Sequence, residues 1–286
     1  MSTWLITGAT SGIGRAVAAQ LLESGNRVAA FAREPRAMDE LAAAYPDLLW
    51  TTRVDITDTR ALRLATERAF AELGHIDVVF SNAGAGAFGA AEELDDAVIE
   101  QQIALNMVAP IQLIRSALPH LRSQGGGRII QMSTMGGQLT TTGGSMYHAS
   151  KWGIEGFTES IMSEVAAFGI GVTLVEPGNV RTPFGAALSV APPIDAYAET
   201  PVGQVRQYIE AAGGNLTGNA LGDPRRVADA IVAVASQTPA PRRLVLGSDA
   251  FDGIRGALVL RLAELDAARS VSASTDFPAA AVPATA

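Results

Sequence analysis

A doubly wound α/β fold with a parallel sheet is predicted by three features of this sequence. Short apolar runs alternate with longer segments of helical period, which is the pattern of βαβ units. The runs are apolar almost throughout, as expected of strands that helices cover on both faces. The first run leads directly into a glycine-rich turn at residues 8–14. At 286 residues the chain lies within the length that α/β sheets reach as one domain.

The apolar runs and helical periods place the elements along the chain. Strands are expected at Trp4–Thr7, Arg27–Ala32, Leu48–Val54, Ile76–Ser81, Arg128–Met132, Gly171–Glu176 and Arg243–Leu246. Helices are expected at Ile13–Glu23, Arg36–Ala44, Thr59–Leu73, Asp95–Ser123, Met146–Phe168, Pro224–Gln237 and Ile254–Ala268. Residues 183–222 form a long connection rich in Gly, Ala and Pro. The folded domain is therefore predicted to cover residues 1–269. Residues 270–286 are mostly Ser, Ala, Pro and Thr with almost no charge, which predicts a disordered tail.

Composition and charge exclude several classes of protein. Hydrophobic residues make up 48% and charged residues 17%, which suits a large packed core. The net charge of −8 argues against a nucleic-acid or anionic-membrane surface, because both favour basic patches. The absence of cysteine excludes disulfides and thiolate chemistry, and three scattered histidines do not predict a metal centre. Since neither a leader pattern nor a run of roughly 18 apolar residues occurs, we expect a cytoplasmic protein that binds no membrane.

The turn Thr7-Gly8-Ala9-Thr10-Ser11-Gly12-Ile13-Gly14 lies between the first predicted strand and the first predicted helix. Glycines in such a turn let the backbone approach a pyrophosphate and let the helix pack closely on the strand. The helix N-terminus offers free N–H groups and a partial positive charge to the anion. The position of the turn directly after an apolar strand therefore predicts a dinucleotide-binding site.

The residues after the second strand indicate which dinucleotide binds. An acidic residue about 20 positions beyond the glycine turn usually holds the ribose hydroxyls of NAD, whereas an arginine suits the 2′-phosphate of NADP. Here Ala32 ends the strand and Arg33 follows it, with a planar, permanently charged guanidinium that matches phosphate geometry. Glu34 is the alternative, since its carboxylate could bind the ribose. On Arg33 we predict NADP(H).

A candidate catalytic group begins with Tyr147-His148-Ala149-Ser150-Lys151. The spacing of four places Tyr147 and Lys151 on one helical face, where the ammonium is expected to lower the tyrosine pKa from about 10. Ser133 follows a predicted strand, at the sheet edge where ligands bind, and its hydroxyl could bond a substrate oxygen. Asn106 lies inside a predicted helix, where asparagine has poor propensity. It is either part of this group or a polar residue on a half-buried face.

Together these motifs resemble the short-chain dehydrogenase/reductase family. The resemblance rests on Thr7–Gly14, Ser81-Asn82-Ala83-Gly84, Asn106, Ser133, the Tyr147–Lys151 motif and Pro177-Gly178. These motifs follow one another from residue 3 to about residue 183, and the likeness continues more loosely to about 268. The spacing T-G-x-x-x-G-x-G is that of the compact branch of the family rather than the extended branch of sugar epimerases. Ser81 replaces an asparagine that is common at its position. The resemblance implies a seven-stranded sheet in the order 3-2-1-4-5-6-7.

The family's mechanism implies a role for each catalytic residue. Tyr147 would exchange a proton with the substrate oxygen as a hydride moves to or from the nicotinamide. Lys151 would hold the nicotinamide ribose and tune Tyr147, Ser133 would orient the carbonyl, and Asn106 would hold a water in a proton relay. Asp55 and Ile56 would flank the adenine, and Thr182 would bond the carboxamide. The implied cofactor contacts are Gly8, Thr10, Ser11, Gly12, Ile13, Gly14, Arg33, Asp55, Ile56, Asn82, Ala83, Gly84, Tyr147, Lys151, Pro177, Gly178, Val180 and Thr182.

The connection 183–222 would form a lid over the substrate in this family, and here it is markedly apolar. Its apolar residues could pack onto the core or line a substrate cleft. The predicted substrate contacts are Ser133, Met135, Leu139, Tyr147 and Phe184. The chain is thus predicted to be an NADP(H)-dependent alcohol dehydrogenase or ketoreductase that acts on apolar alcohols, ketones or aldehydes. A ketoester on an acyl carrier protein fits less well, because few basic residues mark a docking face.

Two other classes stay open at this point. The chain could be a catalytically silent dinucleotide-binding sensor, or a sugar-nucleotide epimerase that retains its cofactor. Only a dehydrogenase would change the near-ultraviolet absorbance of added cofactor when a carbonyl is supplied. Helices that bear the residues corresponding to Asn106 and Tyr147 pair subunits in many members of the family, so a homo-oligomer, dimer or tetramer, is expected.

Overall fold

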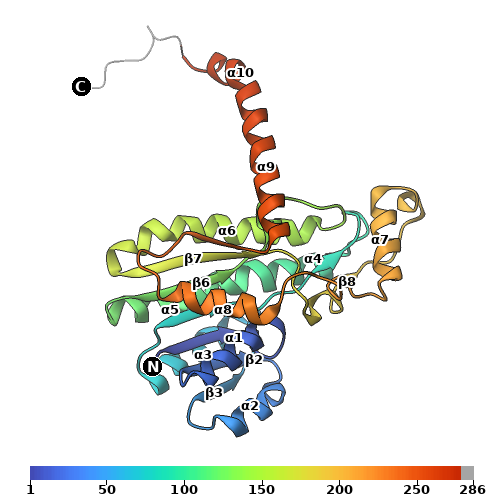
Figure 1. Cartoon of the computed structure of the whole chain (residues 1–286). Coiled ribbons are helices and arrows are strands. Elements are labelled where there is room, and N and C mark those ends of the chain that lie inside the picture. The colour runs from blue at the N-terminus through green and yellow to red at the C-terminus, as the bar shows by residue number, and fades with distance from the viewer. Residues whose placement is uncertain (278–286) are drawn as a thin grey trace.

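A parallel sheet with helices on both faces forms the centre of the structure (Figure 1), a computed structural model that describes residues 1–277. Its strands are β1 (Thr3–Thr7), β2 (Arg27–Ala32), β3 (Leu49–Arg53), β4 (Val78–Ser81), β6 (Gly127–Met132), β7 (Ile170–Pro177) and β9 (Arg243–Leu246). They lie in the order β3-β2-β1-β4-β6-β7-β9, and all are parallel. Counted along this sheet alone, the order is 3-2-1-4-5-6-7, which confirms the predicted fold.

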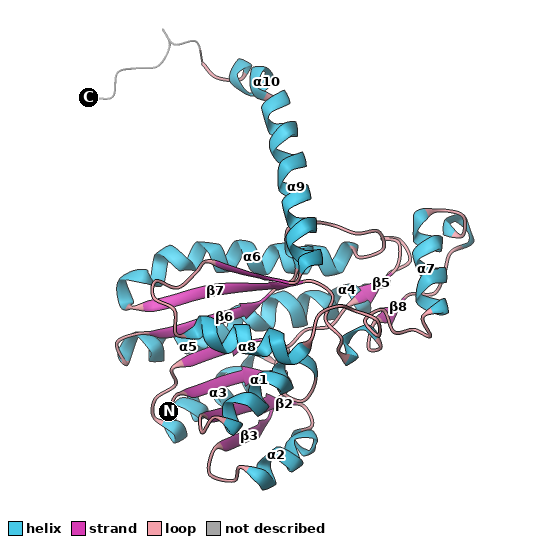
Figure 2. Ribbon diagram, in the orientation of Figure 1, coloured by secondary structure: helices cyan, strands magenta, loops and turns pink. Residues whose placement is uncertain are grey.

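The helices are α1 (Gly12–Glu23), α2 (Asp39–Ala44), α3 (Thr59–Leu73), α4 (Asp96–Ile103), α5 (Ala109–Ser123), α6 (Ser145–Val165), α7 (Pro201–Ala211), α8 (Pro224–Ala235), α9 (Ser248–Ala267) and α10 (Arg269–Ser274). Some of them form two layers around the sheet, whereas α7, α9 and α10 lie away from it (Figure 2). The helices α1 and α8 pack on one face, and α3, α5 and α6 pack on the other. Successive strand residues point to opposite faces, so Trp4 and Ile6 belong to the first core and Leu5 to the second. This two-sided burial explains why the strands are apolar without alternation.

The stretch 96–123 is a continuous helical run with a π-helical turn at Ala104–Val108 between α4 and α5. By length and mean hydropathy it could cross a membrane, with 28 residues and a value of 1.2. Leu113, Ile114 and Leu121 of this run belong to the core on one face of the sheet. The sequence predicts one uninterrupted helix here, and the π-helical turn is the difference.

Several segments depart from the sequence-based expectation. The connection 183–222 contains α7 and the two-residue strand β8 (Ser189–Val190), which pairs with β5 (Ala87–Phe88). The predicted helix 36–44 is divided into a 3-10 turn and α2. The expectation of a structureless tail is wrong for 270–274, which are helical in α10, whereas 278–286 lie outside the described residues.

The last long helix, α9, extends away from the body of the molecule (Figure 1). It begins at Ser248, six residues before the predicted start at Ile254. Only Ala250 and Ile254 of this helix are buried, and its outer half exposes Leu258, Val259, Leu260, Leu262 and Leu265. The N-terminal turn of α9 therefore belongs to the core, while the rest does not.

Candidate active site

The candidate site residues lie at the carboxyl ends of the central strands. Thr7 ends β1, Ser81 ends β4, Met132 ends β6 and Pro177 ends β7. The sheet grows from β1 through β2 to β3 on one side and through β4 to β6 on the other. The strand order therefore reverses between β1 and β4, and open α/β sheets bind ligands in the crevice at such a point.

The glycine turn between β1 and α1 has the shape that a pyrophosphate requires. Gly8 and Gly12 have φ of 71° and 54°, a conformation that side chains rarely adopt. A Cβ at Gly14 would lie 2.3 Å from the Gly8 carbonyl oxygen, so α1 approaches the turn more closely than a larger residue permits. Ser11 makes no side-chain hydrogen bond to α1, and the first turn of α1 carries no acidic residue. The positive end of α1 thus faces the turn without a competing anion, and the turn fits a dinucleotide.

Two further loops close around the glycine turn. Asn82 donates from Nδ2 to the carbonyl oxygens of Thr7 and Gly8, at 3.0 and 3.2 Å. Thr182 lies beside Gly12, because a Cβ at Gly12 would be 3.4 Å from Thr182 Cβ. The predicted contacts Thr10, Ile13, Ala83, Gly84, Pro177, Gly178 and Val180 lie in the glycine turn or in these two loops.

Asp249, in the first turn of α9, anchors one of these loops. Its Oδ2 accepts hydrogen bonds from the backbone N and Nδ2 of Asn179, at 2.8 and 3.1 Å. No local pattern in the sequence points to Asp249, because it is 70 residues from Asn179 in the loop that it holds. The buried start of α9 therefore helps to position the cofactor side of the site.

Arg33 is exposed at the end of β2, close to Asp55. Hydrogen bonds from Thr57 lower the pKa of Asp55, and attraction by Arg33 adds to this effect. Within residues 1–277 no carboxylate lies at ion-pair distance from Arg33, whereas the rival Glu34 lies 3.8 Å from Arg53. The guanidinium of Arg33 is therefore available to an anion at the adenosine end of the site.

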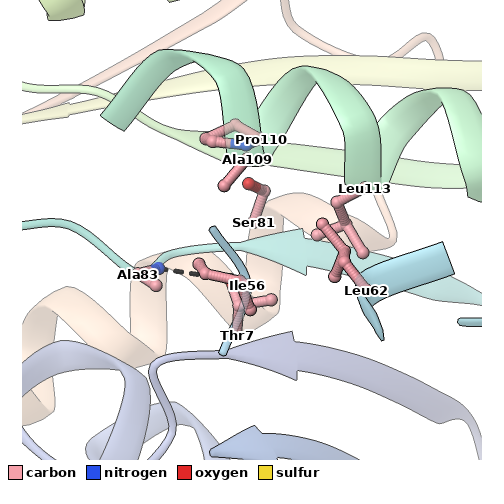
Figure 3. A pocket seen from close by; sticks show the side chains of 8 residues that line it. All are labelled: Thr7, Ile56, Leu62, Ser81, Ala83, Ala109, Pro110 and Leu113. Atoms are coloured by element: carbon pink, nitrogen blue, oxygen red, sulfur yellow. Dashed lines mark hydrogen bonds between the residues drawn. The ribbon is translucent and has the colours of Figure 1, made fainter. Parts of the chain in front are cut away.

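A narrow crevice beside Asp55 is lined by Thr7, Ile56, Leu62, Ser81, Ala83, Ala109, Pro110 and Leu113 (Figure 3). The Ala83 backbone donates to Thr7 Oγ1 at 3.2 Å across it. Ile56 and Ala83 both line this crevice. The structure thus brings together Ile56 and Ala83, two of the residues predicted to contact the cofactor.

Tyr147 and Lys151 share one face of α6, as their spacing predicts. Lys151 Nζ lies 5.9 Å from the centroid of the Tyr147 ring and donates to the Met132 carbonyl oxygen at 3.2 Å. Burial raises the pKa of Tyr147 to about 12, although a hydrogen bond with Thr134 acts in the opposite direction. Burial lowers the pKa of Lys151 to about 8, against the attraction of Glu155. The expectation of a lowered tyrosine pKa is therefore wrong here, because loss of hydration dominates.

Asn106 lies in the π-helical turn and is fully buried. Its Nδ2 donates to the Ala85 carbonyl oxygen at 2.8 Å and to Ser150 Oγ at 3.2 Å, and its Oδ1 accepts from the Ala85 N–H at 3.0 Å. A Cβ at Gly84 would lie 3.2 Å from Asn106 Oδ1 and 3.7 Å from Lys151 Nζ. Asn106 therefore joins the loop after β4 to α6 beside Lys151. Single π-helical turns are frequent at functional sites.

Ser133 follows β6 and donates from Oγ to Glu155 Oε1 at 2.5 Å. The other oxygen of Glu155 accepts from Arg243 Nη1 at 2.8 Å, and the same nitrogen donates to Glu176. Gln138 Nε2 lies 3.0 Å from both Glu176 oxygens. Sequence reasoning missed this network behind Ser133. Two signals were available in the sequence. Glu176 lies inside a largely apolar strand, and Glu155 lies one helical turn beyond Lys151.

The buried Glu176 makes stability depend on pH. Burial and repulsion by Glu155 raise the pKa of Glu176 from 4.5 to about 7, although Arg243 opposes them. A carboxyl group with a raised pKa stabilises the fold fully below its unfolded pKa, and the contribution is lost as pH rises through the folded pKa. We expect the free energy of unfolding to fall between about pH 4.5 and 7 because of this group. Glu176→Gln should make the free energy of unfolding, measured by urea denaturation, depend less on pH across that range. An unchanged dependence on pH would contradict the assignment.

The predicted substrate residues are only partly brought together. The Phe184 ring lies 5.9 Å from the Tyr147 ring, centroid to centroid, and is 37% exposed. Met135 begins a short 3-10 turn two residues after Ser133. Leu139 packs towards α9, since a Cβ at Gly253 would be 2.9 Å from Leu139 Cδ2. Phe184 therefore lies beside the candidate catalytic group.

Comparison with known proteins shows the family to which the chain belongs. The family model for short chain dehydrogenases matches residues 2–191. The oxidoreductase BOA17 of Botryotinia fuckeliana is 30% identical over 250 residues, covering 87% of this chain and 90% of that protein. Human retinol dehydrogenase 5 is 38% identical over 182 residues, covering 62% of this chain and 56% of that protein.

A crystal structure of a short-chain dehydrogenase from Streptomyces avermitilis superimposes with a TM-score of 0.88 at 38% identity, covering 96% of this chain and all of that one. An alcohol dehydrogenase from Thermococcus sibiricus, complexed with 5-hydroxy-NADP, shares the fold with a TM-score of 0.69 at 22% identity, covering 86% and 95% of the two chains. The chain is therefore an oxidoreductase of the short-chain dehydrogenase/reductase family.

Proposed function

We propose that the chain is an NADP(H)-dependent alcohol dehydrogenase or carbonyl reductase that reduces an apolar ketone or aldehyde. The observation that carries the proposal is the contact of Lys151 with Tyr147 and the nearby Asn106, with Ser133 directly after β6 and the glycine turn after β1 at the same edge of the sheet. Each side chain comes from a different part of the chain or a different helical turn. A hydride-transfer site requires such groups close to a turn that can hold the dinucleotide.

The chemistry of the proposal divides between the cofactor and the protein. When bound, NADPH supplies the hydride. Tyr147 supplies the proton, because its raised pKa keeps the phenol protonated at neutral pH. Lys151, partly deprived of water, carries its charge up to about pH 8 and favours the anionic oxygen that develops during transfer. Ser133 bonds the substrate oxygen, and Asn106 holds the loop after β4 against α6, next to Lys151.

The preference for NADP(H) rests on Arg33. Its guanidinium is exposed and is not committed to a carboxylate among residues 1–277, whereas Glu34 lies near Arg53. A free, permanently charged fork at this position suits a 2′-phosphate. Ser11, at the start of the same site, adds a hydroxyl that makes no capping hydrogen bond to α1.

Turnover of a panel of carbonyl compounds with NADPH and NADH side by side tests the proposal. We expect oxidation of NADPH with aryl or alkyl ketones or aldehydes, and slower oxidation of NADH. An epimerase would retain its cofactor through purification and leave the added cofactor unchanged. A sensor would bind NADPH without oxidising it on any substrate. Assembly into a homo-oligomer and a cytoplasmic location stay predictions from the sequence.

The contact between Phe184 and Tyr147 predicts the size preference. If Phe184 covers the substrate, Phe184→Ala removes apolar contact that is specific to bulky ketones. The expected result is a Michaelis constant about tenfold higher for an aryl ketone and nearly unchanged for acetone. A uniform loss of activity across both substrates would mean that Phe184 only packs the lid. Steady-state kinetics on the two ketones separates these results.

A further inference from the structure

The hydroxyl of Ser133 has a single proton, and in this structure Ser133 donates it to Glu155. Ser133 Oγ donates to Glu155 Oε1 at 2.5 Å, a length typical of a hydrogen bond to an ionised carboxylate. Both residues are buried. A serine hydroxyl offers one donor and two lone pairs. With its proton directed at Glu155, Ser133 can accept a hydrogen bond from a substrate alcohol but cannot donate one to a ketone oxygen.

A carboxylic acid at Glu155 reverses this hydrogen bond. The acid would donate to Ser133 Oγ, and the serine proton would then be free for the substrate oxygen. Gly137 permits the close contact, because a Cβ there would lie 1.8 Å from Glu155 Oε1 and 2.7 Å from Ser133 Oγ. The two hydrogen-bond directions need no rearrangement of the surrounding backbone.

We propose that Glu155 is a positioning residue whose protonation state decides whether Ser133 accepts a hydrogen bond from an alcohol or donates one to a ketone. The inference rests on the proposed function, in which Ser133 bonds the substrate oxygen. Carboxylate at Glu155 favours binding of the alcohol, and carboxylic acid favours binding of the ketone.

The groups that face Glu155 include a second buried carboxylate. Arg243 of β9 donates from Nη1 to both Glu155 and Glu176, so the two acids share one guanidinium nitrogen. Burial, with repulsion by Glu155, raises the pKa of Glu176 to about 7. Below about pH 7 a proton is therefore held at Glu176, next to Glu155. Ketone binding favours the form in which Glu155 carries it.

Three other charged groups surround this pair. Lys151 lies one helical turn before Glu155 and attracts its carboxylate. Glu159, one turn after Glu155, accepts from Arg243 Nη2 at 2.9 Å and lies 3.7 Å from Arg242. Glu159 is partly exposed and makes no contact with Ser133, which suits it as a control.

Glu155→Gln tests the inference, because the amide reproduces the acid. Its oxygen can accept from Arg243 while its NH₂ donates to Ser133, so Ser133 stays a donor at every pH. With acetophenone and 1-phenylethanol as probes at pH 8.5, we expect the Michaelis constant to fall about fivefold for the ketone and to rise about fivefold for the alcohol. In the wild type the Michaelis constant for the ketone should rise as pH passes about 7, and in Glu155→Gln it should not.

The control Glu159→Gln should keep the wild-type constants and pH profile. Opposite shifts for ketone and alcohol separate this role from a structural one, which would move both constants in the same direction or change only the melting temperature. If Glu155→Gln keeps the wild-type pH profile while Ser133→Ala abolishes turnover, the inference fails and the proposed function stands. If Ser133→Ala leaves both reactions unchanged, the substrate role of Ser133 fails and this inference fails with it.

A measurement without cofactor or substrate checks the proton itself. Infrared difference titration of the free wild-type protein should show a buried carboxylic acid band that disappears as pH passes about 7. In Glu155→Gln the remaining Glu176 no longer faces a like charge, so the band should disappear at lower pH. A band that titrates identically in both proteins would overturn the shared proton. If Glu155→Gln fails to fold, Glu176→Gln is used in its place. In that variant Glu176 no longer competes with Glu155 for Arg243, and the Michaelis constant for the ketone at pH 6.5 should rise.

Discussion

Replacing Tyr147 by phenylalanine should reduce the turnover number for carbonyl reduction by a factor of about 10² to 10⁴. The substitution removes one hydroxyl and keeps the ring, so the contact with Phe184 and the position of α6 are preserved. Its effect is large because Tyr147 is the only proton donor proposed at the substrate oxygen. The dissociation constant for NADPH, measured by its fluorescence, should stay nearly unchanged.

The matched control is Tyr45→Phe, which removes the same hydroxyl at the end of α2, away from the site. It should leave turnover unchanged. Retention of most activity in Tyr147→Phe would show that another group supplies the proton. Lys151 is then the next candidate, since burial lowers its pKa to about 8 and eases proton loss near neutral pH.

Arg33→Ala should weaken NADPH binding by a factor of about 10 to 100 and leave NADH binding nearly unchanged. The range corresponds to loss of one charge-assisted hydrogen-bonding contact to the 2′-phosphate, a group that NADH lacks. Isothermal titration with each cofactor measures the two affinities directly. Equal losses for both cofactors would falsify the role of Arg33.

Glu34→Gln distinguishes the rival assignment. If Glu34 binds the adenosine ribose, this variant should weaken NADH and leave the Arg33 effect in place. If Glu34 only faces Arg53, both affinities should stay close to those of the wild type. The pair of variants therefore assigns cofactor choice to one residue or the other.

The local patterns of the sequence were sufficient for most of the fold. The strands β2 and β9 and the helix α3 have the predicted limits, and the remaining sheet strands differ by one or two residues at their ends. Period and apolarity act through neighbouring residues, so they can be read without knowing which elements meet. The glycine turn and the Tyr147–Lys151 spacing are local in the same sense, and the structure places both as expected.

Other properties required contacts between residues far apart in the chain. Ser133 and Glu155 are separated by 22 positions, and Glu155 and Arg243 by 88. No periodicity links such residues, and a glutamate in a sequence carries no sign of its burial. The same reason explains the Tyr147 pKa. The spacing to Lys151 indicated a lowered value, whereas the surrounding structure removes water from the phenol and raises it.

The sequence by itself therefore determined the family, the sheet order and the residues that form the candidate catalytic group. Only the tertiary structure decided how deeply those residues are buried, which hydrogen bonds they make, and which distant carboxylates lie beside them. The physical reason is that secondary structure follows from short-range sterics and apolar period. Protonation, in contrast, follows from burial and from charges that the fold brings together.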